Sequence, residues 1–169
     1  MKTPSVLHSA FCAAMSLLPL AEAQPFHTNL SNGSFESGLE DWTATGNVSV
    51  ETTGDPGAPY SPTDGSKLAA FNAVNSAPNG VLSRSLVVPN SISRKHRLRF
   101  DAGNLGFVAH DMTLHLKIEV DGIARVDTDI IVPGTTGGAT YWIACEHEFP
   151  TPVSGEVIIT FSDHSADTA

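Results

Sequence analysis

Hydrophobic and polar side chains alternate with a period of two along much of the chain. The clearest run is DMTLHLKIEV at residues 111–120, in which every second residue is apolar. Successive side chains of a β-strand point to opposite faces, so this run predicts a strand with one face in a core and the other in water. Comparable shorter runs occupy residues 47–51, 67–73, 80–88, 96–102, 141–149 and 156–163.

Turn-forming residues separate these runs. Asp121-Gly122 directly follows the clearest run and is typical of a type I′ turn, so residues 123–132 are expected to return as its hairpin partner. About eight short strands joined in this way predict an all-β fold, either an antiparallel β-sandwich or a jelly roll. We expect a ligand to bind at the long irregular connections, residues 54–66 and 103–111.

The N-terminal segment follows a different pattern. Lys2 precedes an apolar run that ends at Ala21-Glu22-Ala23, which indicates a secretory signal over residues 1–23 with an A-x-A cleavage site. The run is shorter than the ~20 residues that a bilayer requires, so no membrane span is expected. Residues 24–169 then have the length of one domain, which we expect to be secreted or held at the cell surface.

Charge excludes one class of partner. The formal net charge is −9 and is unchanged when residues 1–23 are removed, so the chain repels phosphate backbones and is not expected to bind nucleic acid. The one basic cluster, RKHRLR at 94–99, is expected to divide its charges between the two faces of a strand. Cleavage would leave Cys145 without a disulfide partner, and we expect it to be a small buried residue.

Three sequence motifs carry a family likeness: NGSFESGLEDW at 32–42, DGSKLAAFNA at 64–73, and PNGVLSRSLVVP at 78–89, the last followed by a strand that ends in LRFDAG. They resemble the galactose-binding-like jelly rolls, and among these the CenC-type carbohydrate-binding modules and secreted bacterial proteins with a PEP-CTERM sorting tail. The likeness covers most of residues 29–163 and implies a glycan or polysaccharide as the partner.

The resemblance also has a departure at the C-terminus. Members of the family usually have a further strand after the segment equivalent to EVIITFSD, whereas this chain ends at HSADTA. We therefore expect the domain to be truncated, and a missing closing strand would leave a sheet edge or a flank of the core bare.

A structural calcium ion is a further implication of the resemblance. Related domains bind calcium through the glutamate of the F-E pair and through carbonyl and side-chain oxygens nearby, together with an aspartate of the last strand that has no counterpart here. The matching positions are Glu36, Asn32, Asp64 and Lys67. Calcium prefers six to eight oxygen ligands. The alternative is that Glu36 accepts backbone N–H groups and only fixes the turn.

Candidate sugar-binding residues are aromatic side chains, on which the C–H face of a sugar stacks, and polar side chains that bond its hydroxyl groups. Tyr141 and Trp142 are adjacent in a strand, so they point to opposite faces and one of them is expected to be exposed. Phe35 and Trp42 are instead expected in the core. The full set of candidates is Tyr60, Phe107, Tyr141 and Trp142, with His115, Lys117 and Glu119 on the wet face of residues 111–120. The alternative for these polar residues is an ordinary solvated sheet face.

Three functions follow from these observations. The first is a secreted, non-catalytic carbohydrate-binding module, and the second is a structural domain of the cell surface or matrix without a sugar ligand. An enzyme is disfavoured, because Glu146 and Glu148 would lie side by side on one strand and not across a substrate. His115 and His147 lack the spacing typical of a zinc site.

Overall fold

The computed structural model describes residues 30–54, 61–72, 79–88, 94–104, 109–134, 140–151 and 155–165. Every regular element in these ranges is a β-strand, which confirms the predicted all-β class. Within them no helix has the length and apolar character needed to cross a membrane. The strands are β1 (Thr43–Thr45), β2 (Val48–Thr52), β3 (Lys67–Phe71), β4 (Val81–Val88), β5 (Arg94–Asn104), β6 (Met112–Val120), β7 (Ile123–Val132), β8 (Tyr141–Thr151) and β9 (Gly155–Asp163).

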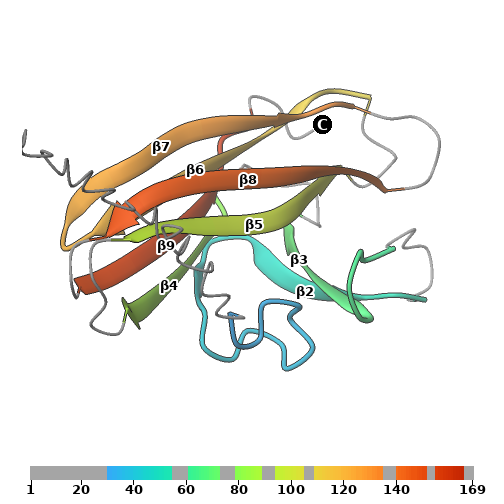
Figure 1. Cartoon of the computed structure of the whole chain (residues 1–169). Coiled ribbons are helices and arrows are strands. Elements are labelled where there is room, and N and C mark those ends of the chain that lie inside the picture. The colour runs from blue at the N-terminus through green and yellow to red at the C-terminus, as the bar shows by residue number, and fades with distance from the viewer. Residues whose placement is uncertain are drawn as a thin grey trace, which may run out of the picture.

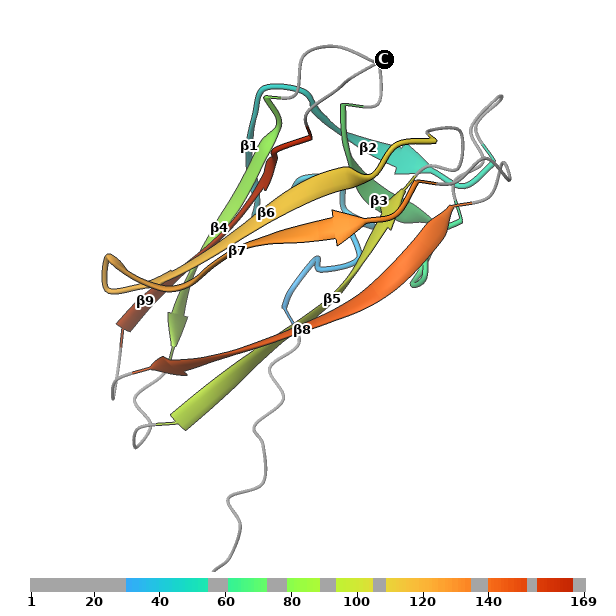
Figure 2. The same ribbon diagram turned by 90° about the horizontal axis from the view of Figure 1, so that it is seen from above.

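The strands form two layers of antiparallel structure. A five-stranded sheet has the order β1-β4-β9-β6-β7, and β5 pairs with β8 to form the facing layer (Figure 1). β2 and β3 form a separate pair at one end of the molecule (Figure 2). The predicted antiparallel β-sandwich is thereby confirmed.

β9 occupies the middle of the five-stranded sheet. It pairs with β4 from Gly155 to Ser162 on one edge and with β6 from Val157 to Asp163 on the other. This strand is the EVIITFSD segment, and both of its edges are hydrogen bonded to neighbouring strands.

The core lies between the layers and contains the side chains that the alternating pattern placed inward. Phe100 of β5 meets Phe161 of β9 edge to face, with ring centroids 5.0 Å apart, which fixes how the layers approach each other. The most deeply buried apolar side chains come from β4, β6 and β9: Leu82, Leu116, Ile118, Val120, Val157 and Ile159.

The β6–β7 hairpin has the predicted turn and an irregularity that was not predicted. Asp121 and Gly122 both have positive φ values, 51° and 75°, as a type I′ turn requires. The register then shifts between Ile118 and Glu119. Because a one-residue shift exchanges the two faces of a strand, Asp127 and Asp129 of β7 lie on the solvent side.

The segment before β1 is attached to β4 by a buried arginine. The guanidinium of Arg84 donates to the main-chain oxygen of Ser31 and lies 3.4 Å from the carboxylate of Asp41. It also lies over the ring of Trp42, 5.5 Å from the centroid. Phe35 and Trp42 pack against the core, as the sequence predicted, with their ring centroids 5.4 Å apart.

The inward faces can be tested by a pair of isoleucine substitutions. Ile118 is fully buried, so Ile118→Ala is expected to lower the free energy of unfolding by about 2–4 kcal/mol, through lost burial and the cavity left behind. The matched control is Ile131→Ala in the adjacent strand, where the residue is 52% exposed and the change should be within about 0.5 kcal/mol. Urea unfolding followed by fluorescence measures both values, and equal losses would contradict the assigned faces.

Candidate functional site

The predicted sugar-binding residues are divided between the two outer faces of the sandwich. His115, Lys117 and Glu119 lie on the outer face of the five-stranded sheet. Trp142 lies on the outer face of the other layer, which we call the β5–β8 face. Tyr60 and Phe107 lie outside the described residues. The structure therefore does not bring the predicted set together into one site.

Trp142 forms a flat platform on the β5–β8 face. It pairs directly with Gly103, and a Cβ atom at that glycine would lie 2.5, 2.7 and 2.8 Å from three adjacent atoms of the indole six-membered ring. These nearly equal distances place the glycine beneath the face of the ring and not at its edge. The indole Nε1 donates a 2.8 Å hydrogen bond to the main-chain oxygen of Ser61, which holds the ring in place.

Tyr141 points to the other side of β8, as expected for a neighbouring residue in a strand. Tyr141 is exposed, at 50%, whereas Trp142 is less accessible and of intermediate burial. The prediction that one of the two aromatic residues is exposed is thus met by Tyr141. Trp142 shares its face of the sheet with Asp101 and Glu146, which line an open hollow further along the strands.

An open hollow of about 400 Å³ lies over the Asp101–Ala144 pair, one same-face position along β8 from Trp142, which does not line it. Its side-chain walls are Arg99, Asp101, Ala144 and Glu146, and its base includes Phe100 and Cys145. Ala144 pairs with Asp101 and follows Trp142 on the same face, where same-face neighbours lie about 7 Å apart along a strand. The small side chain of Ala144 leaves space between the indole and the Arg99–Glu146 pair.

A ladder of ion pairs continues along the β5–β8 face. Arg97 Nη2 donates to Glu148 Oε1 over 2.6 Å, and Arg99 Nε donates to Glu146 Oε2 over 2.7 Å. The hydrogen bond from Arg97 lowers the pKa of Glu148 below its ordinary value. Within the basic cluster, Lys95, Arg97 and Arg99 occupy alternate positions and share one face, whereas the side chain of Arg94 lies outside the described residues.

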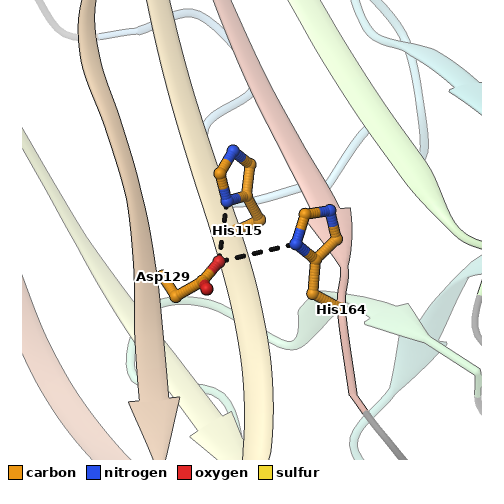
Figure 3. Close-up of side chains that lie close together, drawn as sticks. All are labelled: His115, Asp129 and His164. Carbon is orange, nitrogen blue, oxygen red and sulfur yellow. Dashed lines mark hydrogen bonds and ion pairs between the residues drawn. The ribbon is translucent and has the colours of Figure 1, made fainter.

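The outer face of the five-stranded sheet carries a second cluster, formed by His115, Asp129 and His164 (Figure 3). His115 Nδ1 lies 2.7 Å from Asp129 Oδ1, and His164 Nδ1 lies 3.5 Å from the same oxygen. The two imidazole rings are stacked with centroids 4.3 Å apart. The hydrogen bond with His115 is the main cause that lowers the pKa of Asp129.

Strand pairing and a short hydrogen-bonded segment position this cluster. His115 of β6 is directly opposite Asp129 of β7 and Ser162 of β9. Beyond β9, the backbone N–H of His164 donates to the carbonyl of Thr113. The sequence pointed to His115 but missed Asp129 and His164, because their proximity depends on the bulge in the hairpin and on the pairing of distant strands.

Lys117 and Glu119, the other predicted residues of this face, bind each other. Lys117 Nζ lies 2.9 Å from Glu119 Oε1, and hydrogen bonding to that glutamate is the main cause that raises the pKa of Lys117. An ion pair in which the two side chains neutralise each other's charge is typical of a solvated sheet face. The two residues add no aromatic surface or hollow to the histidine cluster.

The loop for which calcium was predicted is held by hydrogen bonds to Glu36. Its Oε1 accepts from the backbone N–H groups of Ser66 and Lys67 at 2.7 and 2.8 Å, and Oε2 accepts from the Ser66 hydroxyl. These bonds, led by that from the Ser66 backbone, lower the pKa of Glu36. Asn32 uses its side-chain amide to donate to the carbonyls of Gly38 and Glu40.

As arranged, these residues do not fit a calcium ion well. Lys67 brings an ammonium group that donates to the main-chain oxygen of Glu36 over 2.8 Å, where calcium would need an oxygen ligand. Asp64 has an exposed side chain. The geometry matches the alternative in which Glu36 fixes the turn, and calcium binding stays a prediction.

Comparison with known proteins identifies the fold. No family model and no curated protein sequence matches this chain. Among solved structures, TmCBM61 in complex with β-1,4-galactotriose has a TM-score of 0.55 and 16% sequence identity, covering 82% of this chain and 88% of that chain. A family 35 carbohydrate-binding module from Clostridium thermocellum has a TM-score of 0.44 and 18% identity, covering 77% and 85%.

The fold is the jelly roll of carbohydrate-binding modules. At such low identity the likeness extends to the fold alone, so the function has to be argued from this chain's own residues.

The role of Glu36 can be tested by Glu36→Gln. At neutral pH the variant is expected to melt at a lower temperature, because the charged acceptor of the Ser66 and Lys67 N–H groups is lost. A carboxylate whose pKa is lowered by folding stabilises the folded state at pH values above its pKa in the unfolded chain, which is about 4.5 here. This stabilisation is lost as the pH falls through the pKa of the folded state. The difference between the two proteins should therefore shrink in acid. Glu40→Gln, at an exposed position, is the control, and an equal pH dependence would contradict the role.

Calcium is tested separately by thermal melting with added calcium and with EGTA. An ion that binds only the native state must raise the melting temperature, so a bound calcium predicts a higher midpoint in calcium than in EGTA. Lys67→Ala serves as a second protein, since it removes the ammonium that lies against the Glu36 carbonyl. Unchanged midpoints in the wild-type chain would contradict calcium binding.

Proposed function

We propose that this chain is a non-catalytic carbohydrate-binding module whose sugar site is the β5–β8 face around Trp142. The observation that carries the proposal is the indole ring lying flat on Gly103, on the same face as an open hollow with polar walls that begins at the next pair, Asp101–Ala144. An aromatic platform next to polar groups matches the two kinds of contact that a sugar ring offers.

The platform supplies the apolar contact. One face of the indole is against the backbone at Gly103, so the opposite face is directed outward from the sheet. The hydrogen bond from Nε1 to Ser61 restrains the ring before any ligand arrives. A restrained aromatic ring loses little conformational entropy on binding, which favours stacking of a sugar's C–H face.

The hollow supplies partners for hydroxyl groups. The Asp101 carboxylate is exposed and accepts hydrogen bonds, and the guanidinium of Arg99 has donors besides the Nε that binds Glu146. A sugar hydroxyl both donates and accepts, so it can bond to either group. The alternation of these polar residues with Ala144 leaves room for the sugar between them.

Two further considerations support a glycan ligand over a different partner. The structure of TmCBM61 contains β-1,4-galactotriose, which makes β-linked galactans the first ligands to test for this chain. The motif likeness to CenC-type modules and the N-terminal pattern of a secretory signal are consistent with action outside the cell on such a polysaccharide. We include this extracellular location in the proposal.

The residues of this face do not suit glycoside hydrolysis. Glu146 and Glu148 lie on one strand and both bind Arg97. A glycosidase needs a carboxylic acid with a raised pKa facing a second carboxylate across the substrate, whereas the pKa of Glu148 is lowered. Binding without hydrolysis is therefore the function that this face supports best.

The proposal is tested by Trp142→Ala in binding assays against β-galactans and a broad glycan array. The variant is expected to bind at least about tenfold more weakly, equivalent to ~1.4 kcal/mol, because the stacking surface is removed. Tyr141→Ala is the matched control, since that residue is adjacent but points to the opposite side of β8. Circular dichroism verifies that both variants are folded.

The outcomes separate the possibilities. Equal binding by Trp142→Ala and the wild-type chain would contradict the proposed site but not a carbohydrate-binding function. Failure of the wild-type chain on every glycan would contradict the function itself and favour a structural surface domain.

A further inference from the structure

The cluster of His115, Asp129 and His164 contains three groups that are typical ligands of transition metals. Each offers one ligand atom, and these atoms lie within 4.8 Å of one another. They come from β6, from β7 and from the residue that follows β9, and their side chains converge on one point (Figure 3). The cluster is on the opposite layer of the sandwich from Trp142, so it is separate from the proposed sugar site.

The ring nitrogens of His115 show why a cation is suited to this point. Its Nε2 lies 3.2 Å from Asp127 Oδ1, while its Nδ1 lies 2.7 Å from Asp129 Oδ1. A neutral imidazole has one N–H group and one lone pair. A proton on Nδ1 or a metal cation can therefore join this nitrogen to the Asp129 oxygen.

His164 repeats this arrangement from the other side. Its Nε2 lies 3.3 Å from the hydroxyl of Ser162, which can accept a hydrogen bond from it. Its Nδ1 then faces the same Asp129 oxygen at 3.5 Å. One ring nitrogen of each histidine thus faces the same carboxylate oxygen of Asp129.

We propose that His115, Asp129 and His164 bind a divalent transition-metal ion, of which Zn²⁺ best matches two imidazole nitrogens and one carboxylate oxygen. Zinc binds such atoms at about 2.0–2.2 Å, so its ligands are roughly 3.4 Å apart in tetrahedral geometry. His164 and Asp129 already have this separation, and His115 and Asp129 need to move apart by about 0.7 Å.

The surrounding residues support the site in the way that metal ligands are usually supported. Asp127 is placed to accept from the outer nitrogen of His115, which fixes the ring and increases its basicity. The backbone of His164 is tied to Thr113, and the Ser165 hydroxyl accepts from the Thr113 N–H over 3.1 Å. Three protein ligands leave one tetrahedral position for water or for an external group.

The test measures Zn²⁺ binding to the full chain purified without a histidine tag, by competition with a chromophoric chelator. We expect one zinc ion per chain in the wild type, and at least tenfold weaker binding by His164→Ala and by Asp129→Asn. His110→Ala is the matched control, because it removes an exposed histidine outside the cluster and should bind as the wild type does. Asp127→Asn should weaken binding by about tenfold through the orientation of His115.

Cobalt provides a second readout that does not depend on affinity alone. Co²⁺ bound to the wild-type chain should have a visible absorption spectrum typical of nitrogen and oxygen ligands, and this spectrum should be lost in His164→Ala. Zinc should also raise the melting temperature of the wild type but not of that variant.

Two results would overturn the proposal. One is the absence of stoichiometric zinc binding to a folded wild-type chain, which would leave protons as the only cations that join these groups. The other is equal zinc binding by His164→Ala and the wild type, which would locate the ion elsewhere. Neither result bears on glycan binding at Trp142.

Discussion

The pairing of β9 with β4 on one edge and with β6 on the other joins the molecule together. The inward side chains of β9 place Phe161 against Phe100, which connects the five-stranded sheet to the β5–β8 layer. The β4 partner carries Arg84, which fixes the segment from Ser31 to Trp42 on the core. The outer face that carries His115, Asp129 and His164 depends on this central strand, which brings distant segments into one sheet.

Much of this fold could be predicted from the sequence, because strands with one wet face repeat polar and apolar residues at every second position. That rule placed Leu116, Ile118 and Val120 in the core, and the Asp121-Gly122 turn gave the β6–β7 hairpin. It failed at the shift between Ile118 and Glu119, which leaves no mark in the composition of either strand. An unshifted hairpin would have placed Thr128, not Asp129, opposite His115.

The candidate sites were predicted less well, since each depends on contacts between residues far apart in the sequence. The alternation of β8 separated Tyr141 from Trp142, but only the pairing with Gly103 determined which ring lies flat on the sheet. His164 joins His115 through strands whose pairing cannot be read from local pattern. The role of Glu36 could not be predicted because one sequence motif is compatible with two roles. A carboxylate at this position can accept hydrogen bonds from backbone N–H groups, as it does here, or it can bind calcium.

The central position of β9 also determines when the domain can form during synthesis. β4 and β6 have no direct pairing in the sheet order and are joined through a strand that begins at Gly155. At ~5–20 residues per second, the ribosome needs roughly 3–13 seconds to proceed from Val88 to that strand. During this interval β4 lacks the strand that pairs with its edge, and an unpaired strand edge is prone to aggregation.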